Sequence, residues 1–273
     1  MIGYAVSPDG GEGLEALLTD PRHGLIGLDF DGTLAPIVAD PRDARAHPGA
    51  GPVLAKLAAV VGTLAIITGR PALDAVAYAG LAGIPGILVF GHYGWEHWQD
   101  GTLSTPDPLP AVDAARRALP GLLAAADGPA DGAWIEDKGH ALAVHTRRAA
   151  DPDAALERLR APLTALAASL GLAAEPGRFV IELRPRDVDK GSTLRALITQ
   201  RTARSALYVG DDLGDLPAFR AVRELRAAGI PGCAVASGSA EVAEVAAAAD
   251  LVVDGPDGVI GLLGAIADAI SAV

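Results

Sequence analysis

Short apolar runs alternate with segments of helical spacing along the first part of the chain. Residues 25–30, 63–68 and 86–90 are short apolar runs, the pattern expected for buried strands. Between them, residues 52–61 place apolar side chains on one helical face, and residues 73–79 continue the same spacing. This β-α-β-α-β order predicts parallel strands that are joined by crossover helices.

The pattern changes in the middle of the chain. Asp100-Gly101 is typical of a hairpin turn, and the closely spaced Pro106, Pro108 and Pro110 mark a linker. A helix followed by two neighbouring strands then occurs twice, which indicates an α+β module inserted at about residues 107–185. The elements expected in it are helices at 111–126 and 152–170 and strands at 133–137, 141–146, 172–175 and 178–183, with a turn at Pro176-Gly177.

The alternating pattern resumes after the insertion. We expect helices at 190–200, 216–226, 240–248 and 257–272, strands at 206–209, 232–237 and 251–253, and a leading helix at 12–20. The whole chain therefore predicts an α/β fold. Its Rossmann-like parallel sheet is built from residues 1–106 and 186–273, and the α+β module interrupts it.

Composition narrows the class of protein. The chain has 273 residues, half of them hydrophobic, which is enough for a substantial core. A net charge of −12 argues against a nucleic-acid partner, because such surfaces are normally basic. Cys233 is the single cysteine, so a disulfide within the chain is impossible. The N-terminus lacks the features of a signal peptide, and the apolar runs are too short to span a bilayer, so we expect a cytoplasmic protein with no membrane partner.

Two acidic side chains stand at the end of the first predicted strand. Asp29 and Asp31 stand two residues apart, and Gly32 permits a sharp turn after them. Carboxylates at the carboxyl end of a parallel strand face the crevice where ligands bind in open α/β sheets. A bound Mg²⁺ would neutralise them, and an Asp beside a metal can act as a nucleophile. Taken alone, the same pattern is equally typical of an ordinary turn with solvated acids.

A second acidic cluster raises the weight of the chemical interpretation. Gly210-Asp211-Asp212 also follows a buried strand and is expected at the same edge of the sheet, where a carboxylate could complete a metal site. Thr68-Gly69-Arg70 offers a hydroxyl, a main-chain N–H and a cation, which suit phosphoryl oxygens. Lys190 opens a predicted helix, where a positive charge and helix amides favour an anion. Each of these features alone is also compatible with solvated surface.

Together these segments resemble the haloacid dehalogenase superfamily of phosphatases. Its four motifs are D-x-D-G-T, a Ser or Thr after a strand, a Lys, and an acidic G-D-D. They are matched in order by 29–33, Thr68, Lys190 and 210–215. The resemblance implies a parallel-sheet hydrolase core with an inserted α+β cap domain, here residues 107–185.

A narrower resemblance is to the trehalose-6-phosphate phosphatase family. Residues 29–37 are similar to its D-x-D-G-T-L-x-P-I opening, and residues 135–138 to its V-E-D-K. Residues 145–147 and 182–185 are similar to its H-Y-R and E-I-R-P. The chain departs from the family where G-N-H-G-x-E is replaced by residues 91–96, and where Gly214 and Leu216 replace Thr and Glu of the fourth motif.

The resemblance implies a role for each matching residue. Asp29 would be the nucleophile, and Asp31 the general acid and base. Mg²⁺ would be held by Asp29, by the backbone carbonyl of Asp31 and by Asp211, while Asp212 and Asp215 orient the ligands or Lys190. The residues expected to bind substrate are Thr68, Gly69, Arg70 and Lys190 around the phosphate, Glu136, Lys138 and Glu182 at the sugar, and Arg147 near the phosphate or its bridging region.

The implied reaction is hydrolysis of trehalose 6-phosphate to trehalose and phosphate through an aspartyl-phosphate, by a monomer or weak dimer. Alternatives remain open at this point. The substrate could be another disaccharide or pseudo-disaccharide phosphate, sucrose phosphate or a glycosyl-glycerate phosphate. The D-x-D pattern also occurs in metal-dependent glycosyltransferases, and a non-catalytic sugar-phosphate sensor could share the fold. Without the resemblance, Glu136 and Lys138 would read as a solvated hairpin turn.

Overall fold

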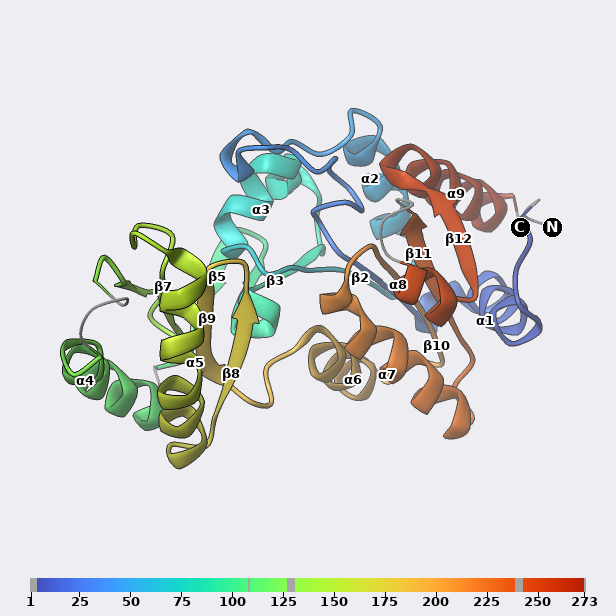
Figure 1. Ribbon diagram of the computed structural model, residues 1–273. Helices are drawn as coiled ribbons and strands as arrows, with labels where there is room; N and C mark the ends of the chain where they lie inside the picture. Colours follow the sequence, from blue (N-terminus) through green and yellow to red (C-terminus); the bar gives the residue numbers. More distant parts are fainter. Residues whose placement is uncertain (1–3, 108, 127–130, 239–242, 273) are drawn as a thin grey trace. The chain divides into compact units, whose positions relative to one another are not determined.

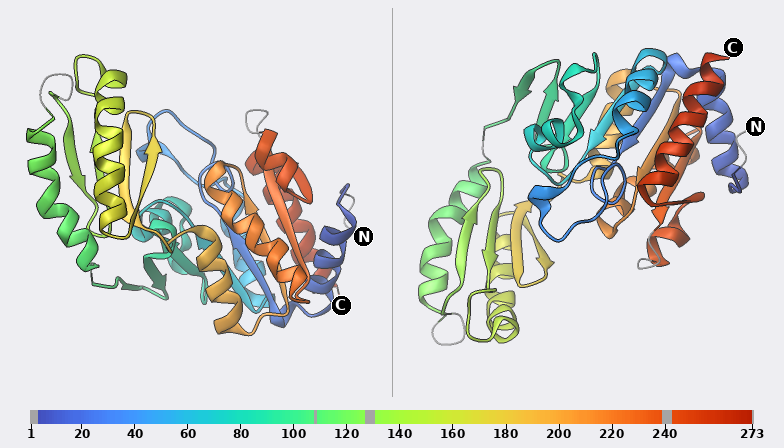
Figure 2. Two further views of the ribbon diagram at one scale, coloured as in Figure 1. Left: turned by 60° about the horizontal axis from the view of Figure 1, so that its bottom comes forward. Right: turned by 90° about the horizontal axis from the view of Figure 1, so that it is seen from above.

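The computed structural model describes residues 4–107, 109–126, 131–238 and 243–272. The chain forms two compact units, one made of Met1–Thr105 and Asp189–Val273 and the other of Pro106–Val188. Figures 1 and 2 show the elements of each unit. Among the residues described, no helix combines the length and the apolar character that crossing a membrane requires.

The first unit is built on one eight-stranded sheet in the order β12-β11-β10-β1-β2-β3-β4-β5 (Figure 1). The strands from β12 to β3 are parallel, and β4 and β5 add an antiparallel edge. The predicted α/β class with a parallel sheet is thus confirmed. The strands are β1 Gly24–Leu28, β2 Thr63–Ile67, β3 Leu88–Gly91, β4 Glu96–Gln99, β5 Thr102–Ser104, β10 Ser205–Gly210, β11 Gly232–Gly238 and β12 Leu251–Asp254.

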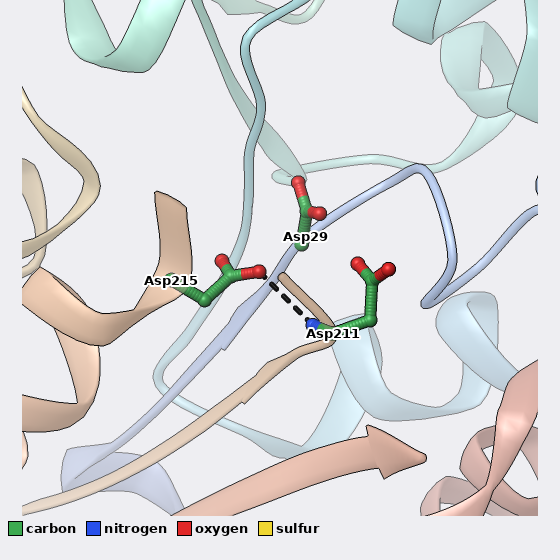
Figure 3. Close-up of side chains that lie close together, drawn as sticks. All are labelled: Asp29, Asp211 and Asp215. Carbon is green, nitrogen blue, oxygen red and sulfur yellow. Dashed lines mark hydrogen bonds between the residues drawn. The ribbon is translucent and has the colours of Figure 1, made fainter. Parts of the chain in front are cut away.

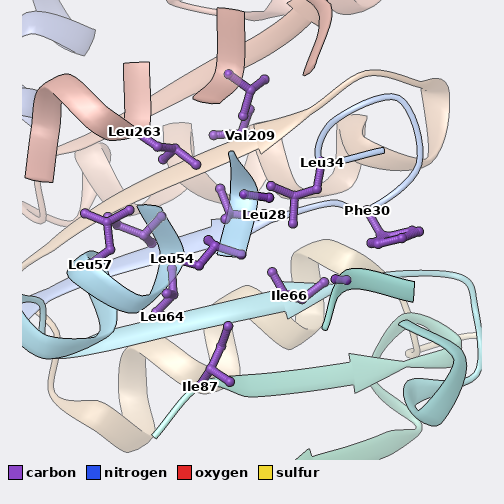
Figure 4. Packing of buried hydrophobic residues seen from close by; sticks show 14 of the residues in the cluster. Leu28, Phe30, Leu34, Leu54, Leu57, Leu64, Ile66, Ile87, Val209 and Leu263 are labelled. Atoms are coloured by element: carbon purple, nitrogen blue, oxygen red, sulfur yellow. The ribbon is translucent and has the colours of Figure 1, made fainter. Parts of the chain in front are cut away.

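Helices cover both faces of this sheet, which explains why its central strands are apolar throughout. Side chains of β1 alternate between the faces: Ile26 and Leu28 pack in one apolar cluster and Leu25 in the other. Figure 4 shows the first cluster, where Leu54 and Leu57 of one helix meet the strands. The helices of this cluster are α1 Pro8–Thr19, α2 Ala50–Val60, α3 Ala72–Ala79 and α9 Gly255–Ser271, and those of the other are α6 Lys190–Arg201, α7 Leu216–Ala227 and α8 Ala243–Ala248.

Two local features of the first unit bear on the sequence predictions. The leading helix α1 begins at Pro8, four residues before the predicted start, because Ser7 caps it by accepting from the Gly10 N–H and proline fits the first turn. The predicted hairpin turn at Asp100-Gly101 is confirmed, and both residues have positive φ, at 47° and 84°. The predicted helix at 240–248 begins outside the described residues, and α8 is described from Ala243.

The second unit is a four-stranded antiparallel sheet in the order β6-β7-β9-β8, with α4 and α5 packed on one face (Figures 1 and 2). The predicted turn at Pro176-Gly177 is wrong. These residues belong to β8, Gly177 pairs with Val180, and the chain turns at Arg178-Phe179, where Phe179 has φ 61°. The elements are α4 Pro110–Ala124, β6 Trp134–Asp137, β7 Leu142–His145, α5 Pro152–Ser169, β8 Leu172–Gly177 and β9 Val180–Pro185.

Candidate active site

The neighbouring strands β1 and β10 end side by side and deliver an acidic cluster to one edge of the sheet. The Asp29 N–H donates to the carbonyl of Val209 at 2.9 Å, which fixes the first acid against the end of β10. Figure 3 shows Asp29, Asp211 and Asp215 close together. Each offers a carboxylate oxygen, and these oxygens lie within 4.8 Å of one another.

Asp215 is the fixed part of this cluster. Its carboxylate is fully buried, and each oxygen accepts twice. Oδ1 accepts from Lys190 Nζ and from the Tyr208 hydroxyl, both at 2.7 Å. Oδ2 accepts from the N–H groups of Asp211 and Asp212 at 3.0 and 3.2 Å. Because all four contacts orient other groups of the site, Asp215 is better suited to holding the loop and Lys190 than to binding an ion directly.

Lys190 lies between two carboxylates. Its Nζ is 2.9 Å from Asp29 Oδ1 and 2.7 Å from Asp215 Oδ1, and only 3% of its side chain is exposed. Asp189 caps the start of α6 by accepting from the Ser192 N–H, so the helix begins at the lysine itself. Burial opposes the charge of Lys190, but the carboxylates of Asp215 and Asp29 outweigh it and raise the pKa of the lysine. The lysine is therefore a fixed positive charge beside Asp29.

Asp211 is the member of the cluster with unused capacity. Burial, and next the charge of Asp215, raise its pKa to about 7. Its Oδ1 is buried and has no hydrogen-bond partner among the residues that the structure describes. Gly32 has φ 69°, and a Cβ at this position would overlap the Asp211 carboxylate. The turn after β1 thus leaves room for that carboxylate, as the D-x-D-G sequence requires.

This donor set fits a hard divalent cation. Burial raises the pKa of Asp29 well above its ordinary value, against the opposing effect of Lys190, so the site lacks positive charge. The buried, unpartnered oxygen of Asp211 points to the same deficit. Carboxylate oxygens are what Mg²⁺ prefers in proteins. Asp29 and Asp211 are therefore the side chains that could hold it.

The Asp31 carboxylate lies outside this cluster and is paired with Arg70. Arg70 Nε donates to Asp31 Oδ2 and Nη2 donates to Oδ1, each at 2.6 Å. This hydrogen bonding raises the pKa of Arg70. Arg70 was expected at the phosphate, whereas in the structure its forked donors hold Asp31. As a cation ligand, Asp31 could then offer only its main-chain carbonyl.

The loop after β2 lines a pocket next to these groups. The pocket has a volume of about 460 Å³ and includes Asp29, Lys190, Thr68 and Gly69 in its wall. The buried Thr68 Oγ1 accepts from the Arg70 N–H at 3.2 Å, which closes a tight turn. A Cβ on Gly69 would contact the Tyr93 hydroxyl at 2.8 Å, so glycine leaves space for that ring. The walls thus combine carboxylates, a lysine and a hydroxyl around one opening.

The second unit carries the remaining predicted residues on the sheet face opposite α4 and α5. Glu136 and Glu182 both pair in register with Ala143 of the intervening strand, so they lie on the same side of the sheet. Lys138 Nζ pairs with Glu182, and Glu136 contacts His145 Nε2 at 2.8 Å. Arg147 is exposed in the turn after β7, beyond the strand that carries Ala143 and His145. The structure therefore brings together Glu136, Lys138 and Glu182 but leaves Arg147 apart.

Two positioning residues were not anticipated from the sequence. The buried Ser237 on β11 donates its hydroxyl to the carbonyl of Gly32 at 2.6 Å and fixes the turn that carries Asp31. Glu96 on β4 accepts from the Ala72 N–H at 2.7 Å, at the start of α3 behind the Thr68 loop. Ser237 has no motif around it. Glu96 ends the segment in which the chain departs from the trehalose-6-phosphate phosphatase pattern.

Comparison with known proteins identifies the family. The trehalose-phosphatase family model matches residues 27–257. The chain belongs to the trehalose-phosphatase family. It is similar to the trehalose-phosphate phosphatases of Mycobacterium avium (38% identical over 223 residues) and Mycobacterium leprae (38% over 225 residues), in each case over 77% of this chain. These matches cover 54% and 50% of the relatives, so the chain spans about half the length of the curated relatives it matches.

Solved structures support the same fold. A trehalose-6-phosphate phosphatase from Aspergillus fumigatus superposes with a TM-score of 0.76 at 23% identity, over 97% of this chain and 99% of the other. The C-terminal domain of the Candida albicans trehalose-6-phosphate phosphatase gives 0.72 at 22% identity, over 97% and 98%. At these identities the likeness establishes the architecture of this trehalose-phosphatase family member.

The departures from the family pattern leave the acidic cluster of this trehalose-phosphatase family member intact. Gly214 lies in the short 3₁₀ turn Leu213–Asp215, and Leu216 begins α7. Asp215 still closes that turn with its full set of hydrogen bonds. Tyr93 takes a positive φ of 63° in the loop after β3, and the hydroxyl of Thr193 donates to its carbonyl at 2.8 Å. Tyr93 also lines the pocket, so the replacement of the family's His by Tyr93 changes the wall of the pocket.

Proposed function

We propose that this protein is a Mg²⁺-dependent phosphatase that hydrolyses trehalose 6-phosphate to trehalose and phosphate through an aspartyl-phosphate. The observation that carries the proposal is the placement of Asp29 beside a buried lysine, with the paired Asp31 next to it in one pocket. Membership of the trehalose-phosphatase family supports the substrate. Burial of the acids supports the need for a cation.

Asp29 is the proposed nucleophile. One of its carboxylate oxygens forms a bond to phosphorus, and the bond from phosphorus to the sugar oxygen breaks. Asp31 delivers a proton to that sugar oxygen, so the sugar leaves as a neutral alcohol. Asp31 then takes a proton from water, whose oxygen attacks phosphorus and releases phosphate from Asp29. Each turnover thus returns both carboxylates to their starting state.

The remaining groups stabilise charge. Lys190 is held at 2.9 Å from Asp29, so its ammonium faces the phosphoryl oxygens during transfer. The Thr68 hydroxyl and the Gly69 N–H line the same pocket and are suited to donate to those oxygens. A Mg²⁺ held by Asp29, Asp211 and the main-chain carbonyl of Asp31 would supply further positive charge, on which phosphoryl transfer largely depends.

The sugar is assigned to the sheet face of the second unit that lies opposite α4 and α5. Glu136, Lys138 and Glu182 present carboxylates and an ammonium there, and such groups match hydroxyls that both donate and accept. Another disaccharide phosphate or a glycosyl-glycerate phosphate is the second candidate. The observation that favours it is Tyr93, which lines the phosphate pocket where the trehalose-6-phosphate phosphatase pattern has a smaller ring.

Phosphate release from trehalose 6-phosphate, glucose 6-phosphate and sucrose 6-phosphate, in Mg²⁺ and in EDTA, tests the proposal. We expect Mg²⁺-dependent release from trehalose 6-phosphate, and its loss in Asp29→Asn. Glu182→Gln should raise KM for trehalose 6-phosphate, while Glu157→Gln, exposed on α5 with Arg160, is the control. Equal release from all three sugars would refute the sugar assignment. Activity that survives Asp29→Asn would refute the nucleophile.

Three further expectations stay predictions. They are the identity of the ion as Mg²⁺, a cytoplasmic location, and a monomeric or weakly dimeric state. Tests are metal replacement in the same assay, fractionation of the source cells, and light scattering of the purified chain over a range of concentrations.

A further inference from the structure

The guanidinium of Arg70 is engaged on its edges and its faces. Nε and Nη2 donate to the two oxygens of Asp31 at 2.6 Å, and Nη1 donates to the carbonyl of Pro41 at 2.7 Å. The rings of Phe30 and Tyr78 lie 5.4 and 5.3 Å from its central carbon. Only 13% of the side chain is exposed. A group held in this way has one orientation.

That orientation decides what Arg70 can do. Arginine binds phosphate best with its Nε–Nη2 fork, through two parallel hydrogen bonds. Here the fork is occupied by Asp31, and Pro41 with the two rings prevents the guanidinium from turning elsewhere. A phosphate would have to displace Asp31 to reach the fork, and the displaced residue is the one that must transfer the proton.

We propose that Arg70 is a positioning residue, which aims the Asp31 carboxylate at the leaving sugar oxygen and at the attacking water and does not bind the phosphate. The inference rests on the proposed phosphatase function. Two parallel bonds fit the carboxylate form, in which Asp31 can accept a proton from water. When one carboxylate oxygen of Asp31 carries the proton towards the sugar, that Asp31 oxygen releases its N–H of Arg70. The hydrogen bond from Arg70 to the other Asp31 oxygen keeps the carboxyl group aligned. Arg70 keeps its own proton throughout.

Leaving-group dependence separates positioning from phosphate binding. A sugar alkoxide needs a proton to depart, whereas p-nitrophenolate leaves as a stable anion without one. In Arg70→Met we expect hydrolysis of trehalose 6-phosphate to fall about 100-fold, the cost of a small misplacement of a catalytic group. Release of p-nitrophenolate in the first turnover should be at least about tenfold less affected, because that step needs no general acid. Its later turnovers should be slow, since Asp31 also activates water.

Matched variants make the comparison specific. Asp31→Asn should reproduce the pattern of Arg70→Met. Arg70→Lys should resemble Arg70→Met, because an ammonium cannot form two parallel bonds to one carboxylate, and added guanidinium should restore Arg70→Ala. Arg45→Met is the control, because Arg45 lies 4.7 Å over the same Tyr78 ring but, within the part of the chain that the structure describes, its side chain donates to the carbonyls of Arg42 and Ala44 and not to a carboxylate. It should behave as the parent protein does.

The outcomes distinguish the inference from the function. If first-turnover release of p-nitrophenolate falls as much as sugar-phosphate hydrolysis, and Arg70→Lys recovers both, Arg70 binds phosphate and the inference is overturned. If the parent protein turns over another sugar phosphate but not trehalose 6-phosphate, the proposed substrate fails, and the same comparison is made with that sugar. A folded parent protein inactive on every phosphate ester overturns both. Thermal unfolding of each variant confirms that it is folded. Rescue by guanidinium compares Arg70→Ala with and without the added ion, so differences in stability between variants do not affect it.

Discussion

Replacing Asp215 by Asn tests whether this residue holds the site together. The change keeps the shape of the side chain but removes its charge and converts one acceptor oxygen into a donor. All four groups that face the carboxylate are donors: Lys190, Tyr208 and the N–H groups of Asp211 and Asp212. In either orientation of the amide, two of these donors therefore lose their acceptor and meet a donor.

The cost follows from the burial of these groups. A hydrogen bond to a charged group contributes about 1.5–3 kcal/mol, so two lost bonds cost about 3–6 kcal/mol. Removing one partner of a buried ion pair costs about 3–5 kcal/mol, which is the same range. Lys190 keeps Asp29 at 2.9 Å, which favours the lower end. We expect the free energy of unfolding of the first unit to fall by about 3 kcal/mol, or about 6–12 °C in Tm for a unit of this size.

Urea and thermal unfolding, followed by circular dichroism, measure this loss. Asp212→Asn is the matched control, because Asp212 is 61% exposed and 4.0 Å from Lys190. It should change the free energy of unfolding by less than about 1 kcal/mol. Phosphatase activity should fall in Asp215→Asn with the misplacement of Lys190. The reasoning is refuted if the free energies of unfolding of Asp215→Asn and Asp212→Asn differ by less than about 1 kcal/mol, which is the scale of an exposed ion pair.

Further outcomes follow from the structure. The pKa of Asp211 is raised from 3.8 to about 7, so the metal-free folded protein holds protons that the unfolded chain has released, and its stability should fall as pH rises across that window. Mg²⁺ competes with those protons, so the Tm gain in Mg²⁺ over EDTA should grow with pH; a constant gain would contradict this. Gly32→Ala should lose the Tm gain in Mg²⁺, because its Cβ would overlap the Asp211 carboxylate. Gly86→Ala is the control: Gly86 has φ 75° and open space among the described residues, so the variant should keep the gain and show only backbone strain. Equal responses of the two variants would contradict the overlap with Asp211. Burial raises the pKa of the Cys233 thiol to about 12, so thiol reagents should label it only after denaturation, and rapid labelling of native protein would contradict its burial.

The sheet of the first unit was predictable because both of its faces are covered. Covered strands must be apolar throughout, and the runs at 25–30 and 63–68 therefore mark β1 and β2 directly. The turn of β8 and β9 was not predictable in the same way. Pro-Gly is normally a turn signal, but cross-strand pairing extends β8 through Gly177 and leaves Phe179 in the positive-φ position.

The candidate site shows the same division. Asp29 and Asp211 follow adjacent parallel strands, and the carboxyl ends of such strands share an edge, so their proximity follows from the order of elements. The positions of partners from distant parts of the chain do not follow from the order of elements. Ser237 reaches Gly32 across 205 positions with no motif to mark it. The sequence shows that Arg70 is charged, but only the fold shows that its guanidinium faces Asp31.

The insertion of one unit within the other has a consequence for synthesis of the chain on the ribosome. Residues 106–188 are contiguous, and the apolar core of this unit comes entirely from them, so it can form as soon as that segment has emerged. The first unit must wait, because β10, the direct neighbour of β1, lies after the insertion. Until then, β1 has an unpaired edge that is open to wrong pairing. Lys190, Asp211 and Asp215 also follow the insertion, so the edge of the sheet that carries the candidate site is among the last parts of the chain to fold during synthesis.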